Sequence, residues 1–217
     1  MRSWKLVVKR AFDLLFTVVA LVCLLPVGLV LAVVIILESP GSAIYRSRRV
    51  GKGGQVFTLY KFRTMVVNAE TIGPSVTHAA DPRVTRVGRL LRRTKFDEFP
   101  QVLNVLKGDV SIVGPRPETP KYVALYSADQ LEVLRVAPGL TSLAQVVYRE
   151  EEKILPSVET EAYYLQKVLP RKLALDLYYA KTWSLGLDSR IFLMGVLALL
   201  RISPPAVLWP FKDEVRR

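Results

Sequence analysis

One long uncharged run dominates the distribution of apolar residues in this chain. Residues 14–37 contain no Asp, Glu, Lys or Arg, and as a helix they would extend roughly 36 Å, enough to cross a bilayer. Pro26 lies near the centre of the run, where it removes a backbone donor and favours a kink. Basic residues lie on both sides, so the charge pattern gives a spanning helix no clear orientation.

Two structures satisfy this pattern. In one, the helix enters the membrane, bends at Pro26 and returns to the same face, although the backbone groups freed at the bend then need partners at membrane depth. In the other, the helix spans the bilayer in the ordinary way and tolerates its proline. The residues alone leave both structures open.

The polar and apolar positions after residue 40 predict shorter elements. Partly alternating segments at 43–49 and 55–62 flank a glycine-rich stretch at 51–54, which predicts a β-hairpin. That stretch lacks the Gly-Lys-Ser/Thr ending of a nucleotide-binding loop, so we interpret it as a turn. Further helices are predicted over 122–136, 160–167, 171–183 and 191–200, and the last is followed by the apolar residues Val207, Leu208, Trp209 and Phe211.

An amphipathic helix is predicted between the hairpin and residue 94. Val84, Val87 and Leu91 fall on one side of it. The other side is basic and consists of Arg83, Arg86, Arg89 and Arg93. Such a stripe could bind phosphates, lie among anionic lipid headgroups or simply be solvated.

Composition narrows the class of protein. The 217 residues include 31 Lys plus Arg against 19 Asp plus Glu, a formal charge of +12, which favours a polyanionic partner. Hydrophobic residues make up 51% and the mean hydropathy is +0.27, so a membrane surface is favoured over a soluble nucleic-acid complex. Cys23 is the single cysteine, which excludes an internal disulfide.

Two adjacent carboxylates are the first candidates for chemistry. Asp97 and Glu98 lie between Phe96 and Phe99. Acids held against apolar neighbours can have shifted pKa values, which suits a nucleophile or a base. The alternative is a solvated acidic pair near a helix end.

A proline-caged arginine follows within about twenty residues. Arg116 lies between Pro115 and Pro117, and a fixed guanidinium is suited to binding a phosphate. The alternative is a structural salt bridge to Glu118 or Asp109. A nucleophile and an anion clamp so close in sequence suggest chemistry on a phosphate.

Taken in order, these segments resemble the monotopic phosphoglycosyl transferases, the bacterial sugar transferase family. The resemblance covers nearly the whole chain, and the order and spacing of its motifs make it specific. One departure is Leu25, where the family often has serine before the proline. Besides the apolar helix and residues 92–101, the matching segments are Lys9-Arg10-Ala11-Phe12-Asp13, Arg49-Val50-Gly51, Lys61-Phe62-Arg63-Thr64-Met65, residues 108–117, Pro138-Gly139-Leu140-Thr141, Asp176-Leu177-Tyr178-Tyr179 and Trp183-Ser184-Leu185.

The resemblance implies a specific reaction and location. A sugar 1-phosphate would pass from a UDP-sugar to a polyprenyl phosphate such as undecaprenyl phosphate, with release of UMP, as the first membrane step of a bacterial glycoconjugate pathway. Asp97 would be the nucleophile and carry a covalent phosphosugar. Glu98 would hold Mg²⁺ beside Asp97 or handle a proton. Phosphates would be bound by Arg116, Lys61, Arg63 and Arg89.

The expected fold is mainly α with a small β-hairpin, in the α+β class. Residues 1–40 would form a re-entrant membrane helix broken at Pro26, on the cytoplasmic face of the bacterial inner membrane. Residues 41–217 would form a catalytic domain with interfacial amphipathic helices, equivalent to the catalytic core of larger relatives. The expected partners are the UDP-sugar, the polyprenyl phosphate and membrane lipid, but not nucleic acid, and pairing into a homodimer is left open. Residues 140–160 are candidates for selecting the sugar.

A membrane-anchored basic module that binds nucleic acid or anionic lipid without catalysis is the alternative from a different class. It suits the +12 charge and the arginine-rich helix. It gives no reason for the acid pair or for the proline-caged arginine.

Overall fold

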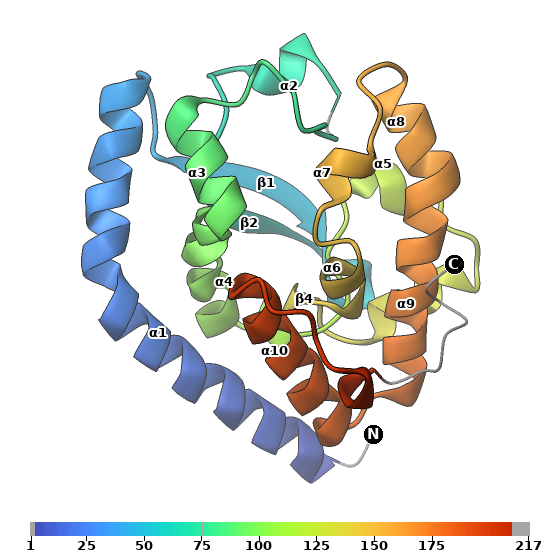
Figure 1. The fold of residues 1–217 in the computed structure, drawn as a ribbon. Coiled ribbons are helices and arrows are strands. Elements are labelled where there is room, and N and C mark those ends of the chain that lie inside the picture. Colours follow the sequence, from blue (N-terminus) through green and yellow to red (C-terminus); the bar gives the residue numbers. More distant parts are fainter. Residues whose placement is uncertain (1–2, 75, 210–217) are drawn as a thin grey trace.

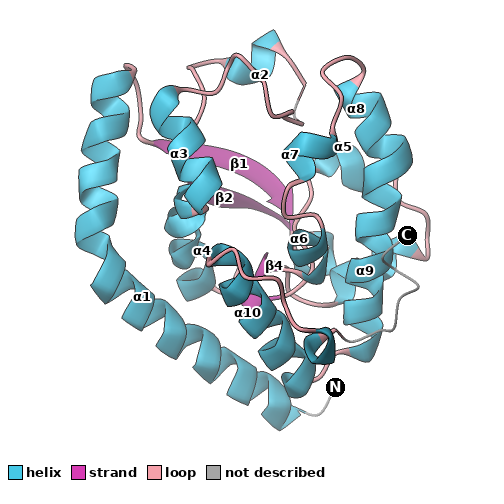
Figure 2. Ribbon diagram, in the orientation of Figure 1, coloured by secondary structure: helices cyan, strands magenta, loops and turns pink. Residues whose placement is uncertain are grey.

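The computed structural model describes residues 3–74 and 76–209, most of which are helical (Figure 1). Two small two-stranded sheets lie among the helices (Figure 2). The predicted mainly helical fold with a minor β component is therefore confirmed. Helix α1 runs along one flank of the molecule, and the remaining elements pack together beside it.

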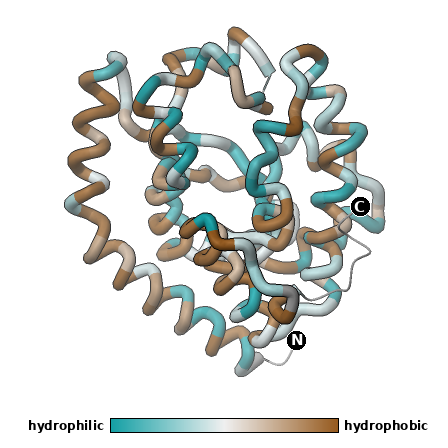
Figure 3. The backbone as a smooth tube through the Cα atoms, in the orientation of Figure 1, coloured by the Kyte–Doolittle hydropathy of each residue, from teal (hydrophilic) through white to brown (hydrophobic). Residues whose placement is uncertain are grey.

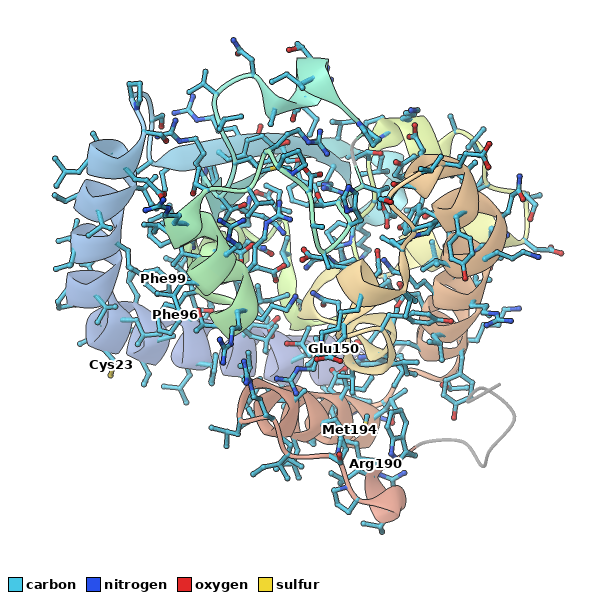
Figure 4. All side chains as sticks on the ribbon, turned by 45° about the horizontal axis from the view of Figure 1, so that its top comes forward. Cys23, Phe96, Phe99, Glu150, Arg190 and Met194 are labelled. Atoms are coloured by element: carbon cyan, nitrogen blue, oxygen red, sulfur yellow. The ribbon has the colours of Figure 1, made fainter. Side chains whose placement is uncertain are left out.

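Helix α1 (Ser3–Glu38) is continuous and contains Pro26 in its interior. It changes direction partway along its length, and Cys23, three residues before the proline, lies at the bend (Figure 4). A proline lacks the N–H that would bond the carbonyl four residues earlier, here that of Val22. We name the parts before and after the bend the N-terminal arm and the C-terminal arm.

The N-terminal arm is fixed to the rest of the chain by polar contacts. Lys9 Nζ lies 2.8 Å from Asp188 Oδ2. Asp13 accepts hydrogen bonds from the Ser111 hydroxyl at 2.8 Å and from the Ile112 N–H at 3.0 Å. Because Asp13 is buried, these contacts determine where the arm meets the domain.

The C-terminal arm returns to the same body of the protein. The N–H of Val87, at the start of α3, donates to Glu38 Oε1 at 3.0 Å. Just beyond the helix, the Arg63 guanidinium donates to the carbonyls of Ser39 at 2.6 Å and Pro40 at 2.7 Å. Both ends of α1 are therefore held by one domain.

The outer face of α1 is apolar. The segment Trp4–Glu38 is long and apolar enough to cross a membrane, and only 11% of its most apolar part is buried inside the structure. Figure 3 shows hydrophobic residues along most of the helix. An apolar surface of this size is expected to be removed from water by a partner. The apolar core of a bilayer matches it in length and in chemistry.

The predicted hairpin is confirmed. Strands β1 (Ile44–Val50) and β2 (Val56–Phe62) pair antiparallel, with Ile44 opposite Phe62 and Val50 opposite Val56. The glycine-rich stretch forms the 3-10 turn Lys52–Gly54 between them. The buried residue Phe62 packs in a small core with Ile35 of α1 and Leu91 of α3.

Helices α2 (Ala69–Ile72), α3 (Arg86–Thr94) and α4 (Val102–Lys107) follow the hairpin. The predicted amphipathic helix is present as α3, but Arg83 does not belong to its basic side. Arg83 precedes the helix, is buried, and pairs with Asp81 at 2.6 Å. The ion pair with Asp81, two residues earlier, holds Arg83 outside the helix. A prediction from helical periodicity takes no account of such local contacts.

Strands β3 (Ser111–Val113) and β4 (Gly139–Thr141) form a short parallel pair that the sequence analysis did not predict. They lie in the largest core, which includes Leu175 and Ile191. The helices in the second half of the chain are α5 (Pro120–Val123), α6 (Leu143–Val147), α7 (Glu151–Ile154), α8 (Thr160–Tyr163), α9 (Leu169–Thr182) and α10 (Leu185–Leu199).

The helix predicted over 122–136 was wrong. Helix α5 ends at Val123, and a separate 3-10 segment covers Gln130–Arg135. Between them, Ser127 and Gln130 exchange side-chain-to-backbone hydrogen bonds at 2.9 and 3.3 Å, a capping pair that starts a new helical turn at Ser127 instead of continuing α5. The helices predicted over 160–167 and 171–183 are present as α8, a π-helical turn (Tyr164–Val168) and α9.

The apolar residues at the end of the described chain belong partly to the core. Leu208, in the 3-10 turn Ala206–Leu208, and Trp209 pack against the largest cluster, whereas Val207 is exposed. Phe211 lies outside the described residues. Met194 of α10 lies in the same cluster, and Figure 4 shows its position along that helix.

Candidate active site

The acid pair lies on a short 3-10 segment, η2 (Phe96–Gln101), directly after α3. Lys95, which lies between α3 and η2, has a left-handed backbone conformation with φ of 60°. This conformation ends α3 and turns the chain. The aromatic residues on either side of the acids pack towards α1 and the hairpin (Figure 4). Phe99, for example, stacks on Phe62 at a ring distance of 6.5 Å. This apolar anchoring fixes the segment that presents Asp97 and Glu98.

Glu98 lies between two cations. Lys61 Nζ, from β2, donates to Glu98 Oε1 at 3.0 Å. Arg116 donates to both oxygens of Glu98, at 2.6 Å to Oε1 and 3.2 Å to Oε2. Of the salt-bridge partners that the sequence suggested for Arg116, neither is used in the described structure: Glu118 bonds the Tyr164 hydroxyl at 2.6 Å, and Asp109 accepts from Asn104.

Two glycine-containing motifs position Arg116. Gly114 donates to the Thr141 carbonyl at 3.1 Å, and Gly139 donates to the Pro115 carbonyl at 2.8 Å, so the loop after β3 lies against β4. A Cβ on Gly139 would lie 2.0 Å from the Gly114 nitrogen, closer than any side chain permits. The proline-caged arginine is therefore held by backbone contact across the parallel strand pair.

Asp176 of α9 adds a further constraint to this loop. Its Oδ2 accepts a hydrogen bond from the Arg116 N–H at 3.1 Å, and the side chain is buried. Burial raises the pKa of Asp176 to about 7. The sequence analysis placed Asp176 in a family motif but gave it no role, because its contact with Arg116 joins positions 60 residues apart.

Asp97 is the least satisfied member of the cluster. Its side chain is 8% exposed, and Oδ1 is buried without a hydrogen-bond partner among the described residues. Burial raises the pKa of the Asp97 carboxyl, and the nearby Lys61 ammonium opposes that rise. A buried carboxylate oxygen with no partner is costly, and such atoms in native proteins call for an explanation.

The surroundings of the two neighbouring acids shift their pKa values in opposite directions, upwards for Asp97 and downwards for Glu98. Burial disfavours the charged form of Glu98 as well, but Arg116 and Lys61 outweigh it and hold the pKa of Glu98 far below its usual range. Burial also lowers the pKa of Lys61, although Glu98 acts against this. Glu98 is therefore a fixed anion, while Asp97 has the unpaired oxygen.

Two other predicted phosphate ligands lie apart from this cluster. Arg63 bonds the carbonyls at the end of α1, and Arg89 is exposed on α3. The structure therefore brings Lys61 and Arg116 together at Glu98, but it does not bring Arg63 or Arg89 there. Arg92, which the sequence analysis did not single out, favours the ionised form of Asp97 and bonds Thr64 and Glu152.

The adjacent carboxylates of Asp97 and Glu98 are candidates for holding a cation. Within the described residues there is no group of three or more His, Cys, Asp or Glu side chains that could hold a metal. A cavity of about 170 Å³ lies beside Lys9, Asp13 and Trp183, and neither Asp97 nor Glu98 lines it. A second cavity, of about 20 Å³, is lined by Arg116 of the cluster together with Val50 and Glu118.

The cluster lies within a region that matches a known family. A family model described as bacterial sugar transferase matches residues 4–202. The chain belongs to the bacterial sugar transferase family. The resemblance noted from the sequence is thereby confirmed, and in this member of the family Asp97, Glu98 and Arg116 form one contiguous cluster.

Several relatives of this chain are named as undecaprenyl-phosphate sugar-phosphate transferases. A putative undecaprenyl-phosphate N-acetylgalactosaminyl 1-phosphate transferase of Bacillus subtilis (strain 168) is 50% identical over 117 residues, covering 54% of this chain and 65% of that protein. A UDP-glucose:undecaprenyl-phosphate glucose-1-phosphate transferase of Caulobacter vibrioides is 41% identical, covering 88% of this chain and 69% of that protein.

A UDP-N-acetylgalactosamine-undecaprenyl-phosphate N-acetylgalactosaminephosphotransferase of Aeromonas hydrophila is 37% identical, covering 89% of this chain and 44% of that protein. The matches thus span between less than half and about two thirds of these relatives' own lengths. The sugars named for these relatives are N-acetylgalactosamine and glucose, so their names do not identify one sugar donor for this chain.

Proposed function

We propose that this protein transfers a sugar 1-phosphate from a UDP-sugar to undecaprenyl phosphate or a similar polyprenyl phosphate. The observation that carries the proposal is the adjacency of Asp97, whose buried Oδ1 has no hydrogen-bond partner among the described residues, to Glu98, which is held by Lys61 and Arg116. Membership of the bacterial sugar transferase family and the names of the relatives support the same reaction class.

The proposed chemistry consists of two displacements at one phosphorus. In the first, a carboxylate oxygen of Asp97 attacks the phosphorus that bears the sugar. An O–P bond forms, the diphosphate P–O bond breaks, and UMP leaves with the electron pair of that bond. In the second, a phosphate oxygen of the polyprenyl phosphate attacks the same phosphorus, which forms the lipid diphosphate and returns Asp97 as a carboxylate.

The charges around Asp97 suit these steps. Because Glu98 stays ionised, it does not act as a proton donor, and its function is to hold Lys61 and Arg116 in place. A guanidinium has five N–H donors and Glu98 accepts from two of its nitrogens, so Arg116 retains donors for a phosphate. Lys61 and Arg116 together would stabilise the charge on the transferring phosphoryl group.

The carboxylates fit a magnesium ion. Mg²⁺ prefers oxygen ligands and commonly binds through one or two carboxylates plus substrate phosphates, a donor set that the adjacent Asp97 and Glu98 match. Asp97, whose Oδ1 has no hydrogen-bond partner among the described residues, and Glu98 would hold it. When bound, the ion would reduce the repulsion between the carboxylate and the diphosphate.

A re-entrant path for α1 at the cytoplasmic face of the inner membrane is part of the proposal. It is supported by the bend near Pro26 and by contacts from both arms to the same domain. If α1 crossed the bilayer, its two ends would lie on opposite faces, which these contacts oppose. We expect Lys5→Cys and Ser42→Cys to react from one side of sealed vesicles with an aqueous maleimide, and Cys23 to react only after detergent is added.

The reaction is tested by UMP release. The detergent-solubilised protein is mixed with undecaprenyl phosphate, Mg²⁺ and a panel of UDP-sugars, beside Asp97→Asn and the exposed control Asp129→Asn. We expect lipid-dependent release from one sugar, lost in Asp97→Asn and kept in Asp129→Asn. Release that persists in Asp97→Asn would disprove the covalent role. Absence of release with every sugar, together with salt-sensitive binding of polyanions, would favour the non-catalytic basic module.

A further inference from the structure

Gln101, the last residue of η2, is buried with no hydrogen-bond partner. Its exposed fraction is 0%, and within the described residues neither Oε1 nor Nε2 forms a hydrogen bond. A side-chain amide buried without partners destabilises a fold, because both its donor and its acceptor lose their bonds to water. An apolar side chain of similar size would avoid this cost, so the amide requires an explanation.

A neighbouring amide shows what a structural role looks like in this chain. Asn104, three residues further on, is also 0% exposed. Its Nδ2 donates to the Thr58 carbonyl at 2.6 Å and to Asp109 at 3.2 Å, and its Oδ1 accepts from the Tyr60 N–H at 3.1 Å. The fold therefore satisfies one buried amide fully and leaves the adjacent one with nothing.

Gln101 lies four residues after Asp97, and three after Glu98, on the same short 3-10 segment. Side chains three residues apart eclipse in a 3-10 helix, so Gln101 lies on the face of Glu98, roughly 6 Å further along the axis, and about a third of a turn from Asp97. Asp97 Oδ1 is the other unpartnered polar atom of this segment. The unsatisfied groups of η2 are therefore concentrated around the residue proposed to bond the phosphosugar.

We propose that Gln101 is a further catalytic residue, whose amide binds the phosphosugar while Asp97 carries it. An amide both donates and accepts, which matches a group that offers phosphoryl oxygens and sugar hydroxyls. The Asp97 O–P bond brings the phosphoryl group inside the site, where Gln101 Nε2 donates to one of its oxygens. The bonds made and broken remain those of the two displacements already given, and this inference rests on the proposed function.

Such an arrangement favours the reaction at the expense of the resting fold. A donor that is unpaired before reaction and paired when charge develops on the phosphoryl oxygens stabilises the transition state more than the free enzyme. It follows that removing the amide should have opposite effects on stability and on activity. A purely structural glutamine would lower both when replaced.

The test uses Gln101→Met, which keeps the length of the side chain and removes both polar atoms. The full chain is mixed with a UDP-sugar labelled in the sugar and without polyprenyl phosphate, and covalent label on the protein is followed in time. We expect the rate of labelling to fall roughly 100-fold, the lower end of the effect of removing one transition-state donor. We also expect the unfolding midpoint to rise by on the order of 3 °C, because unpaired groups are removed.

Two further variants complete the experiment. Gln101→Glu keeps the shape but removes the donor, and we expect a similar loss of labelling. Gln130→Met, which removes a glutamine in a surface turn, should label at the wild-type rate. Wild-type labelling by Gln101→Met, or a lower unfolding midpoint of that variant including failure to fold, would overturn the role of Gln101. Absence of label on the wild-type protein would instead disprove the proposed function from which it follows.

Discussion

Replacing Glu98 by glutamine tests whether the charged cluster holds the site together. The substitution keeps the shape of the side chain but leaves Lys61 and Arg116 without their shared counter-ion. The side chains of Glu98, Lys61 and Arg116 are 13%, 18% and 17% exposed, so water compensates little for the lost charge. Breaking a buried ion pair by removing one partner costs about 3–5 kcal/mol. We expect about 3 kcal/mol, the lower end, because a sixth of each cation still meets solvent.

The assay is thermal unfolding in a single detergent, with a double-mutant cycle of Glu98→Gln, Arg116→Gln and the double variant. In a chain of this size each kcal/mol corresponds to roughly 2–4 °C, so Glu98→Gln should lower the midpoint by roughly 6–12 °C. The double variant should lose less than the sum, with a coupling energy of about 1.5–3 kcal/mol. Additivity within about 0.5 kcal/mol would refute the reasoning, since contacting charges must couple.

The pH dependence provides a second test of Glu98. Its folded pKa lies below its ordinary value of 4.5, so its charge stabilises the folded state above pH 4.5. This contribution decreases as the pH falls below 4.5 towards the folded pKa. Glu98→Gln should therefore flatten the loss of stability in acid, and an unchanged acid profile would contradict the assigned pairing.

Three further predictions concern the surroundings of the cluster. The Asp176 pKa of about 7 lies above the ordinary 3.8, so its contribution to stability is present below pH 3.8 and lost as the pH rises through 7; Asp176→Asn should flatten the unfolding midpoint between pH 4 and 8. Gly139→Ala should destabilise the fold by at least about 1–3 kcal/mol in denaturant titration, because its Cβ would overlap Gly114. Glu38→Gln should cost about 0.5–1 kcal/mol by the same titration, since Glu38 accepts from Val87 at the positive end of α3. No change in the respective measurement would contradict each assignment.

The elements that the sequence predicted are those with local signals. The long apolar helix follows from an uninterrupted run, and the hairpin follows from alternation around the glycine-rich stretch 51–54. The failures have equally local causes that periodicity does not register. The turn between Ser127 and Gln130 interrupts the predicted helix over 122–136, and the pairing of Arg83 with Asp81 removes one arginine from the basic side of α3.

The candidate site was only partly accessible from sequence. The motifs identified Asp97, Glu98 and Arg116 as candidates, but not that Glu98 and Arg116 bond each other. That contact depends on the parallel pairing of β3 with β4, two three-residue strands too short for a sequence signal. That the Gln101 amide has no partner among the described residues likewise follows only from the packed structure, because it depends on which donors and acceptors surround the side chain.

The hydrogen bonds between Arg63 and the end of α1 connect the candidate active site to the thickness of the bilayer. Arg63 bonds the carbonyls of Ser39 and Pro40 at the end of α1, and two residues earlier in the chain Lys61 bonds Glu98. With α1 embedded as proposed, its depth is set by how well its apolar length matches the acyl chains around it. A shift in that depth would pull on Arg63 and so on the strand that holds Lys61. Transfer rates should therefore pass through an optimum as the acyl chains are lengthened. The thickness of the bilayer would then determine the position of Lys61 relative to Glu98.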